Sequence, residues 1–179
     1  MAIHKFNMLF KDLETNLGKG IALKIFPEYA TIPDKMDKDD QAKLMRLVMD
    51  RMDKKLDHET IVKIRHGHTC NLPKKQKQEM FELMLKCKNI EEFLVAYYHC
   101  TKQEDGTYLT NFGPGATKCW CGLFNKLDKY EPISITWCEC CNGHTQKGIM
   151  EIWGQPVKTK IIESVASGGK SCRYNITVL

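Results

Sequence analysis

Five cysteines lie within residues 119–141, and thiols this closely spaced can bind a metal ion. They form Cys-Trp-Cys at 119–121, followed after sixteen residues by Cys-Glu-Cys-Cys at 138–141. Two Cys-x-Cys pairs joined by a loop can bring four thiolates around one tetrahedral ion, and structural zinc sites use four sulfur or nitrogen ligands. The predicted zinc ligands are Cys119, Cys121, Cys138 and Cys140.

Other interpretations of these cysteines stay open. An iron–sulfur cluster uses the same four thiolates and is the alternative cofactor. Buried cysteines can also act as small apolar residues, although five of them in 23 residues favour a metal. A closed four-sulfur site would be structural, whereas three protein ligands and a water would leave a position open for chemistry. Four further residues could join the site: Cys70, Cys141, His144 and Cys172.

A second group of reactive residue types lies at His66, His68 and Cys70. In a helix His66 and Cys70 lie one turn apart, and a histidine beside a cysteine can take the thiol proton to produce a nucleophilic thiolate. The sequence offers no recognisable oxyanion site or orienting acid to accompany it. The alternative is a buried cysteine near a helix end with two solvated histidines, so no catalytic residue is assigned.

The composition is that of a soluble globular protein. The 179 residues are 42% hydrophobic and 27% charged, which suits one hydrophobic core. The N-terminus lacks the apolar run and cleavage site of a signal peptide, and no segment approaches the roughly eighteen apolar residues of a membrane span. Nine cysteines without an export signal argue against a disulfide framework. We therefore expect a cytoplasmic protein without a membrane partner.

The net charge of +5 does not indicate a nucleic-acid partner. Lys and Arg are spread along the chain with Asp and Glu interleaved, whereas a nucleic-acid interface would show a clustered basic stripe. The densest basic run, residues 74–77, lies at a predicted helix start and is interpreted as a solvated helix face. No nucleic-acid partner is expected.

The first hundred residues, which would help to position these side chains, are predicted to be helical. Apolar residues recur at steps of three and four from Ala42 to Leu56, the period of one helical face. Asp39 or Asp40 is predicted to cap this helix, and Asp57 to cap the next one. The methionines on the first helix are interpreted as core.

Two more helices are predicted, one beginning at 71–73 and one at Asn89. Proline is accepted in a first helical turn, and Asn89 with Glu92 resembles a capping box. The inward face of the first of these helices is predicted to carry Phe81, Met84 and Leu85. Segment 21–33, with two prolines and no clear period, is predicted to be a connection.

Beyond residue 101 the pattern changes to turns and strands. A short extended piece at 107–111 lies among glycine and proline turns, and 142–153 is predicted as a helix ending at Gly154. Segments 157–166 and 171–178 flank a glycine turn, as in a β-hairpin. Four residues of the last segment are predicted to share one face: Cys172, Tyr174, Ile176 and Val178.

The sequence thus predicts an α+β fold. A helical N-terminal part, residues 1–101, is expected to pack on a small antiparallel sheet with a C-terminal β-hairpin and a cysteine-rich metal knuckle. That second part spans residues 102–179, and the two are expected to form one compact unit.

Three segments of the second part resemble the 4-vinyl-reductase domain, a small-molecule-binding module of bacterial sensors and tetrapyrrole-related proteins. They are 137–144, with Trp-Cys and Asn-Gly-His, then Trp-Gly-Gln-Pro-Val at 153–157 and Gly-Gly-Lys-Ser-Cys-Arg-Tyr at 168–174. The resemblance implies a Cys-Trp-type start before a helix, a Gly-x-Pro-Val step into a strand and a terminal hairpin. It also implies a fold similar to vesicle-tethering subunits, which often pairs through its helices, so a homodimer is a possible state.

In zinc-containing members, the resemblance implies a metal held by a first cysteine, by a Glu and a Cys before the hairpin, and by a hairpin cysteine. Cys138 and Cys172 match the first and last ligands. Ile161 and Ser164 stand at the two middle positions, with Glu163 close by. The natural substitutes are Cys119, Cys121 and Cys140.

Two functions are therefore expected from the sequence. The first is a zinc-stabilised small-molecule-binding or sensory domain of a cytoplasmic, bacterial-type protein. The alternative is a cysteine- or zinc-dependent hydrolase acting on a small heterocyclic substrate, since the Gly-x-x-x-Cys-x-Tyr ending more weakly resembles the L-2-amino-thiazoline-4-carboxylate hydrolase family. The ligand is expected to be flat and apolar, because aromatic residues could wall its pocket. The candidate wall residues are Tyr97, Tyr98, Trp120, Trp137 and Trp153.

Overall fold

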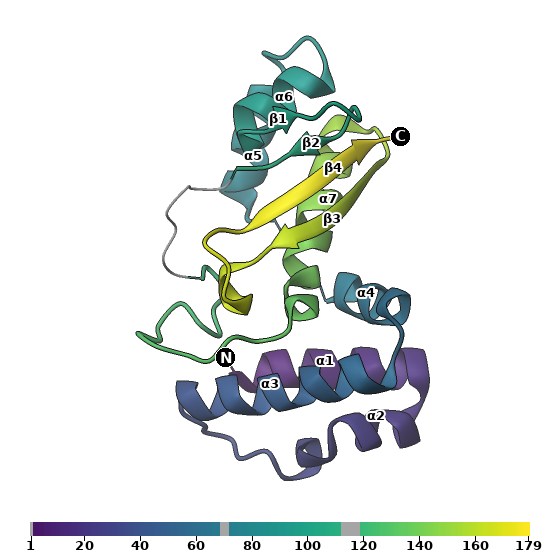
Figure 1. Cartoon of the computed structure of the whole chain (residues 1–179), viewed down its shortest axis with the longest axis vertical. Helices are drawn as coiled ribbons and strands as arrows, with labels where there is room; N and C mark the ends of the chain where they lie inside the picture. The colour runs from purple at the N-terminus through teal and green to yellow at the C-terminus, as the bar shows by residue number, and fades with distance from the viewer. Residues whose placement is uncertain (1, 69–71, 112–118) are drawn as a thin grey trace. The chain divides into compact units, whose positions relative to one another are not determined.

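The computed structural model describes residues 2–68, 72–111 and 119–179 (Figure 1). Contacts divide the chain into two compact units, each assembled from three separate stretches. Unit 1 comprises Met1–His68, Lys118–Glu139 and Ala166–Gly168, and unit 2 comprises Thr69–Thr117, Cys140–Val165 and Gly169–Leu179. Both units therefore draw on residues from both sides of position 101.

Unit 1 is helical. Its helices are α1 (Ala2–Leu17), α2 (Lys19–Ile25), η1 (Pro27–Thr31), α3 (Lys38–Lys55), α4 (His58–Gly67) and η2 (Ile135–Cys138). Helix α1 packs against α2 and α4, and the methionine face of α3 is buried. An aromatic cluster joins α1 to the following segments, with the rings of Phe10 and Tyr29 stacked at 3.8 Å. The interpretation of the α3 methionines as core is confirmed.

The prediction that segment 21–33 is a connection is wrong, because the last five residues of α2 and all of η1 lie within it. Ala22, Ile25 and Phe26 are fully buried there. The two prolines interrupt no α-helix, since Pro27 begins η1 and Pro33 follows it. Two short helical pieces with one buried side do not produce the long periodic pattern on which the sequence prediction relied.

The cap of α3 is Asp37, not Asp39 or Asp40. Its carboxylate accepts a hydrogen bond from the backbone N–H of Asp40 at 2.8 Å. Asp39 and Asp40 lie in the first turn. Acidic side chains there interact favourably with the positive end of the helix dipole but do not cap the backbone. The predicted cap of α4 is confirmed, because Asp57 accepts from the N–H of Thr60 at 2.8 Å.

We expect Asp37→Ala to lower the free energy of unfolding by about 1 kcal/mol, because a backbone N–H of α3 loses its acceptor. Asp39→Ala removes the same charge from the same helix end without removing the cap, and should cost about 0.3–0.5 kcal/mol. Urea unfolding followed by circular dichroism measures both. Equal losses would show that charge near the helix start, rather than the capping hydrogen bond, is what matters.

Unit 2 combines helices with an antiparallel sheet. Its elements are α5 (Lys74–Met84), α6 (Ile90–Tyr98), β1 (Thr101–Lys102), β2 (Tyr108–Leu109), α7 (Glu139–Trp153), β3 (Val157–Glu163), η3 (Val165–Ser167) and β4 (Arg173–Val178), with the first residue of α7 and the last two of η3 counted in unit 1. The strand order is β1-β2-β4-β3, and every neighbouring pair is antiparallel. The predicted α+β fold, antiparallel sheet and C-terminal hairpin are confirmed.

Helices α5, α6 and α7 cover one face of this sheet (Figure 1). The core between them contains side chains from every layer: Met80, Phe93, Leu94, Tyr98, Ile149, Ile152, Val157 and Ile176. Tyr174 and Ile176 are buried on β4 as predicted, while Cys172 at its start is half-buried. None of the described helices combines the length and apolar character that a membrane span requires.

The predicted inward face of α5 is confirmed for Met84, which is half-buried and packs against the core, and is wrong for Phe81 and Leu85. Met80 is fully buried, whereas Phe81 is exposed and Leu85 has an exposed fraction of 67%. Leu85 is the C-cap residue beyond the last helical turn, so the helical period no longer directs its side chain inward. The predicted Asn89 cap of α6 is confirmed, since its side chain accepts from the N–H of Glu92 at 2.9 Å.

Candidate functional site

The four predicted zinc ligands come from two segments of the chain, 119–121 and 138–140. Cys119, Cys121 and Cys138 belong to unit 1, and Cys140 is the first residue of a unit 2 stretch. Cys119, Cys138 and Cys140 are buried, and Cys121 is half-buried. Within residues 2–68, 72–111 and 119–179, no group of three or more His, Cys, Asp or Glu side chains is placed to hold a metal ion. The zinc set stays a prediction.

The Cys-Trp-Cys segment forms a tight turn whose two sulfurs accept N–H donors. The backbone N–H of Cys121 donates to Sγ of Cys119 at 3.4 Å. The ammonium of Lys5, on α1, donates to Sγ of Cys121 at 3.2 Å. The Cys121 carbonyl accepts from the N–H groups of Phe124 and Asn125, both at 2.8 Å. Both sulfurs of the Cys-Trp-Cys turn thus face N–H donors from within unit 1.

A fully buried arginine that the sequence analysis did not single out lies nearby in the same unit. The Arg65 guanidinium lies 4.2 Å from the ring centroid of Trp137, which is also buried. Its Nη2 donates to the Trp137 carbonyl at 3.0 Å. Periodicity is the sequence signal that could have identified Arg65. It follows Ile61 by four residues and so lies on the apolar face of α4.

His68 follows the last residue of α4 and contacts a carboxylate from α1. Its Nδ1 lies 3.1 Å from Oδ2 of Asp12, 56 residues earlier in the chain. Burial, reinforced by the cations Arg65, Lys5 and His4, lowers the pKa of His68 to about 3 and outweighs the nearby carboxylate. Burial likewise raises the pKa of Asp12. Asp12 is thus the carboxylate that His68 contacts, and a neutral His68 donates to it from Nδ1.

His66 forms the second histidine–carboxylate pair. Its Nε2 lies 3.2 Å from Oε2 of Glu139, whose side chain is buried. Neither histidine is thus a freely solvated side chain. Cys70, the third member of the predicted group, lies outside the described residues, and so does Asn71, the predicted start of the following helix.

The further residues considered as metal ligands lie in unit 2. Sγ of Cys140 lies 4.0 Å from Sγ of Cys141 at the start of α7, and His144 follows within the same helix. Glu163 accepts from the backbone N–H of Lys170 at 2.7 Å and the hydroxyl of Ser171 at 3.2 Å. These hydrogen bonds lower the Glu163 pKa and close the β3–β4 hairpin.

The predicted wall aromatics belong to different units. Tyr97, Tyr98 and Trp153 pack with Phe93 in unit 2, where the Trp153 and Phe93 rings stack at 5.8 Å. Trp137 is part of the unit 1 core, and Trp120 is 85% exposed. Packing in the core of one unit or the other thus accounts for four of these five aromatic residues without a ligand.

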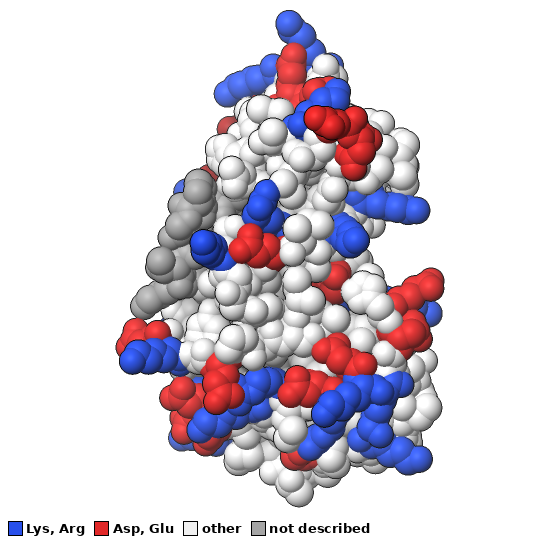
Figure 2. Space-filling model, viewed as in Figure 1, with Lys and Arg blue, Asp and Glu red and all other residues white. Residues whose placement is uncertain are grey.

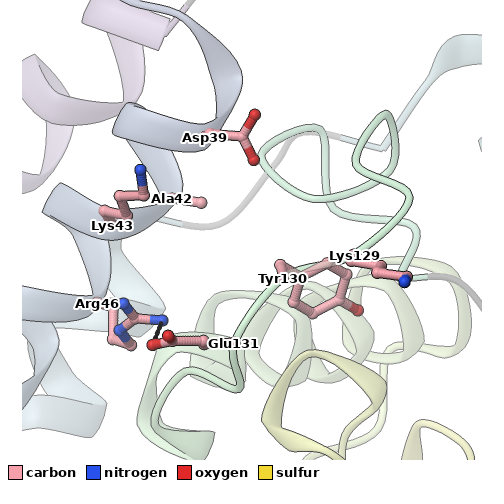
Figure 3. Close-up of a pocket in the computed structure, with 7 residues that line it drawn as sticks. All are labelled: Asp39, Ala42, Lys43, Arg46, Lys129, Tyr130 and Glu131. Atoms are coloured by element: carbon pink, nitrogen blue, oxygen red, sulfur yellow. Dashed lines mark ion pairs between the residues drawn. The ribbon is translucent and has the colours of Figure 1, made fainter.

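A pocket of about 370 Å³ lies in unit 1 between α3 and the segment preceding η2 (Figure 3). It is lined by Asp39, Ala42, Lys43, Arg46, Lys129, Tyr130 and Glu131. Arg46 and Glu131 form an ion pair across it. Its lining is charged, in contrast to the apolar pocket expected from the sequence. On the face drawn in Figure 2, basic and acidic side chains also lie interspersed.

Comparison with known proteins places the chain in a family but attaches no activity to it. No curated protein matches the sequence. No solved structure matches it either. One family model, described as a family of unknown function (DUF6144), matches residues 2–179. Because that match covers nearly the whole chain, the protein belongs to the DUF6144 family.

Proposed function

We propose that this chain is a zinc-stabilised domain that binds a small molecule, with a binding or sensory role in a cytoplasmic protein of bacterial type. The observation that carries the zinc part is the 119–125 turn. The sulfurs of Cys119 and Cys121 each accept an N–H donor there, one of them the Lys5 ammonium at 3.2 Å. Metal ligation requires thiolates, and N–H donors beside the two sulfurs would hydrogen-bond them in the metal-bound state.

The remaining zinc ligands in this proposal are Cys138 and Cys140, as the sequence spacing predicts. Cys138 ends η2 in unit 1. In this proposal the bound ion draws the four sulfurs together. Metal affinity would then be linked to the folding of the segments that carry these cysteines.

The small-molecule part of the proposal draws support from the C-terminal elements of unit 2. Helix α7 is followed by Gly154 with a φ of 75°, then Pro156, and β3 begins at Val157. Strand β4 completes the hairpin. These are the helix, the Gly-x-Pro-Val step and the terminal hairpin that the resemblance to the 4-vinyl-reductase domain implies.

A thiol-dependent hydrolase is the second candidate, and the Asp12–His68 pair is the observation in its favour. An acid that orients a histidine is part of many nucleophile-activating groups. The His68 pKa of about 3 weighs against this role, because an efficient general base has a pKa near the working pH. We therefore favour binding over catalysis.

The zinc proposal is tested by elemental analysis and by melting curves. The purified protein should contain about one zinc per chain, and removing it with a chelator should lower the melting temperature. Serine substitution at Cys119, Cys121, Cys138 or Cys140 should reduce zinc content, while Cys87→Ser, at a half-buried cysteine of unit 2, should not. Metal-free protein that melts at an unchanged temperature would contradict the proposal. If the protein instead contains iron and shows a visible absorption band, the cofactor is an iron–sulfur cluster rather than zinc.

The choice between binding and catalysis is tested with a melting screen of small aromatic, tetrapyrrole and heterocyclic compounds. A ligand that binds only the folded protein must raise its melting temperature. Recovery of a stabilising compound unchanged supports a binding domain. Conversion of the compound, lost in Cys70→Ala, would instead establish the hydrolase.

A further inference from the structure

The guanidinium of Arg65 is a buried cation with unused hydrogen-bond donors. Arg65 is fully buried on α4, yet among the described residues its Nε and Nη1 have no acceptor. Nε carries one N–H and Nη1 carries two. A buried charge is costly unless it is paired and hydrogen-bonded. The Trp137 carbonyl, which accepts from Nη2, satisfies only part of this group.

The carboxylates of this cluster do not fill those positions. Asp12 contacts His68, and Glu139 contacts His66. Neither carboxylate accepts a hydrogen bond from Nε or Nη1 of Arg65. Two carboxylates thus face two histidines, while Nε and Nη1 of Arg65 have no acceptor within residues 2–68, 72–111 and 119–179.

A second cation strengthens the positive potential at the same indole. The ammonium of Lys5 lies 5.9 Å from the Trp137 ring centroid, and the Arg65 guanidinium lies 4.2 Å from it. Stacking on Trp137 also holds the planar guanidinium in one orientation. An arginine held this way presents its N–H groups in a fixed fork that matches the oxygens of a carboxylate or phosphate.

From this geometry we infer that unit 1 binds an oxyanion, the carboxylate or phosphate group of a small molecule, at the Arg65 guanidinium beside Trp137, where Nε or Nη1 forms a fork with the second N–H of Nη2. The group would enter past His66 and Asp12, whose side chains are 25% and 26% exposed. The inference rests on the proposed small-molecule binding only for the identity of the natural ligand. It adds an anionic group to the flat molecule expected from the sequence.

The test uses the full-length protein and titrates it with phosphate, sulfate, acetate or benzoate. Sodium chloride at matched ionic strength is the reference. A bound oxyanion should raise the melting temperature with the logarithm of its concentration above the dissociation constant, by about 5 °C at roughly a hundred times that constant. Preference for phosphate and sulfate would indicate a phosphoryl ligand, and preference for acetate and benzoate a carboxylate. A rise no larger than that in chloride would overturn the inference.

Variants assign the effect to this arginine. Arg65→Met should abolish the oxyanion-dependent rise, and Arg65→Lys should retain a charge but weaken binding at least tenfold, because an ammonium lacks the fork. Arg51→Met is the matched control, since Arg51 is an arginine of unit 1 that already pairs with Glu28. If Arg65→Met does not fold, the Arg65→Lys titration decides, and unchanged affinity in it would contradict the assignment.

The zinc measurement separates this inference from the proposed function. Arg65→Lys should keep its zinc content while losing anion affinity, because Arg65 is not a predicted ligand. Loss of the oxyanion response with intact zinc would therefore concern the Arg65 site alone. An intact oxyanion response in protein without any zinc would contradict the zinc proposal and leave the Arg65 site standing.

Discussion

Trp137→Ala is expected to lower the free energy of unfolding by about 3–5 kcal/mol, the largest effect of any single change considered for this chain. Trp137 is fully buried in η2 of unit 1. The substitution leaves a cavity the size of an indole. It also removes the aromatic surface on which the Arg65 guanidinium stacks at 4.2 Å, so a buried cation loses part of its environment.

Trp120→Ala is the matched control for this prediction. Trp120 lies in the same unit but is 85% exposed, and its removal should change stability by less than about 0.5 kcal/mol. Trp137→Phe should recover part of the loss, because a smaller ring still packs beneath Arg65. Urea unfolding of the three variants measures these differences. Comparable losses for Trp137→Ala and Trp120→Ala would contradict the packing described for η2.

Lowering the pH from about 8 to about 5 is expected to remove about 2 kcal/mol of stability through His68 alone. The pKa of His68 is lowered from 6.5 to about 3 in the folded protein. The unfolded chain therefore binds a proton near pH 6.5 that the folded chain does not. This contribution is fully present above pH 6.5 and declines as the pH falls toward 3.

The groups around His68 affect its pKa and the pH dependence of stability in directions that can be assigned. Burial is the main cause of its lowered pKa, and the cations Arg65, Lys5 and His4 add to it. Burial raises the Asp12 pKa, so Asp12 offsets part of the loss only near and below its own pKa. Glu28 and Glu163, whose pKa values are lowered from 4.5, contribute at still lower pH. These three carboxylates therefore contribute little between pH 6.5 and 5.

The measurement is urea unfolding at a series of pH values for the native chain and for His68→Gln. The glutamine cannot take up a proton, so its stability should be nearly flat over this window while that of the native chain falls. His58→Gln is a suitable control, because His58 is an exposed histidine on the same helix. Parallel curves for the native chain and His68→Gln would show that His68 is not the group responsible.

Much of the fold follows from patterns that are local in the sequence. The repeat of apolar residues along α3, the Asp57 and Asn89 caps, and the β3–β4 hairpin around its glycine turn all concern residues within a few positions of one another. Contacts between residues so close in the sequence depend mainly on the local sequence, so they can be predicted from it. The errors at Asp37 and Leu85 are shifts at helix ends, where only the final position of the backbone determines which residue caps and which side chain turns inward.

The site depends on contacts between residues far apart in the chain. Asp12 meets His68 across 56 residues, His66 meets Glu139 across 73, and the Arg65 guanidinium meets the Trp137 carbonyl across 72. Periodicity places Arg65 on an apolar helix face but cannot reveal which ring or carbonyl will face it there. The cysteine spacing likewise supplies suitable ligand types at 119–121 and 138–141, while convergence of their sulfurs depends on how the intervening loop folds. Burial makes these polar side chains select particular partners, and burial is a property of packing between elements rather than of any one segment.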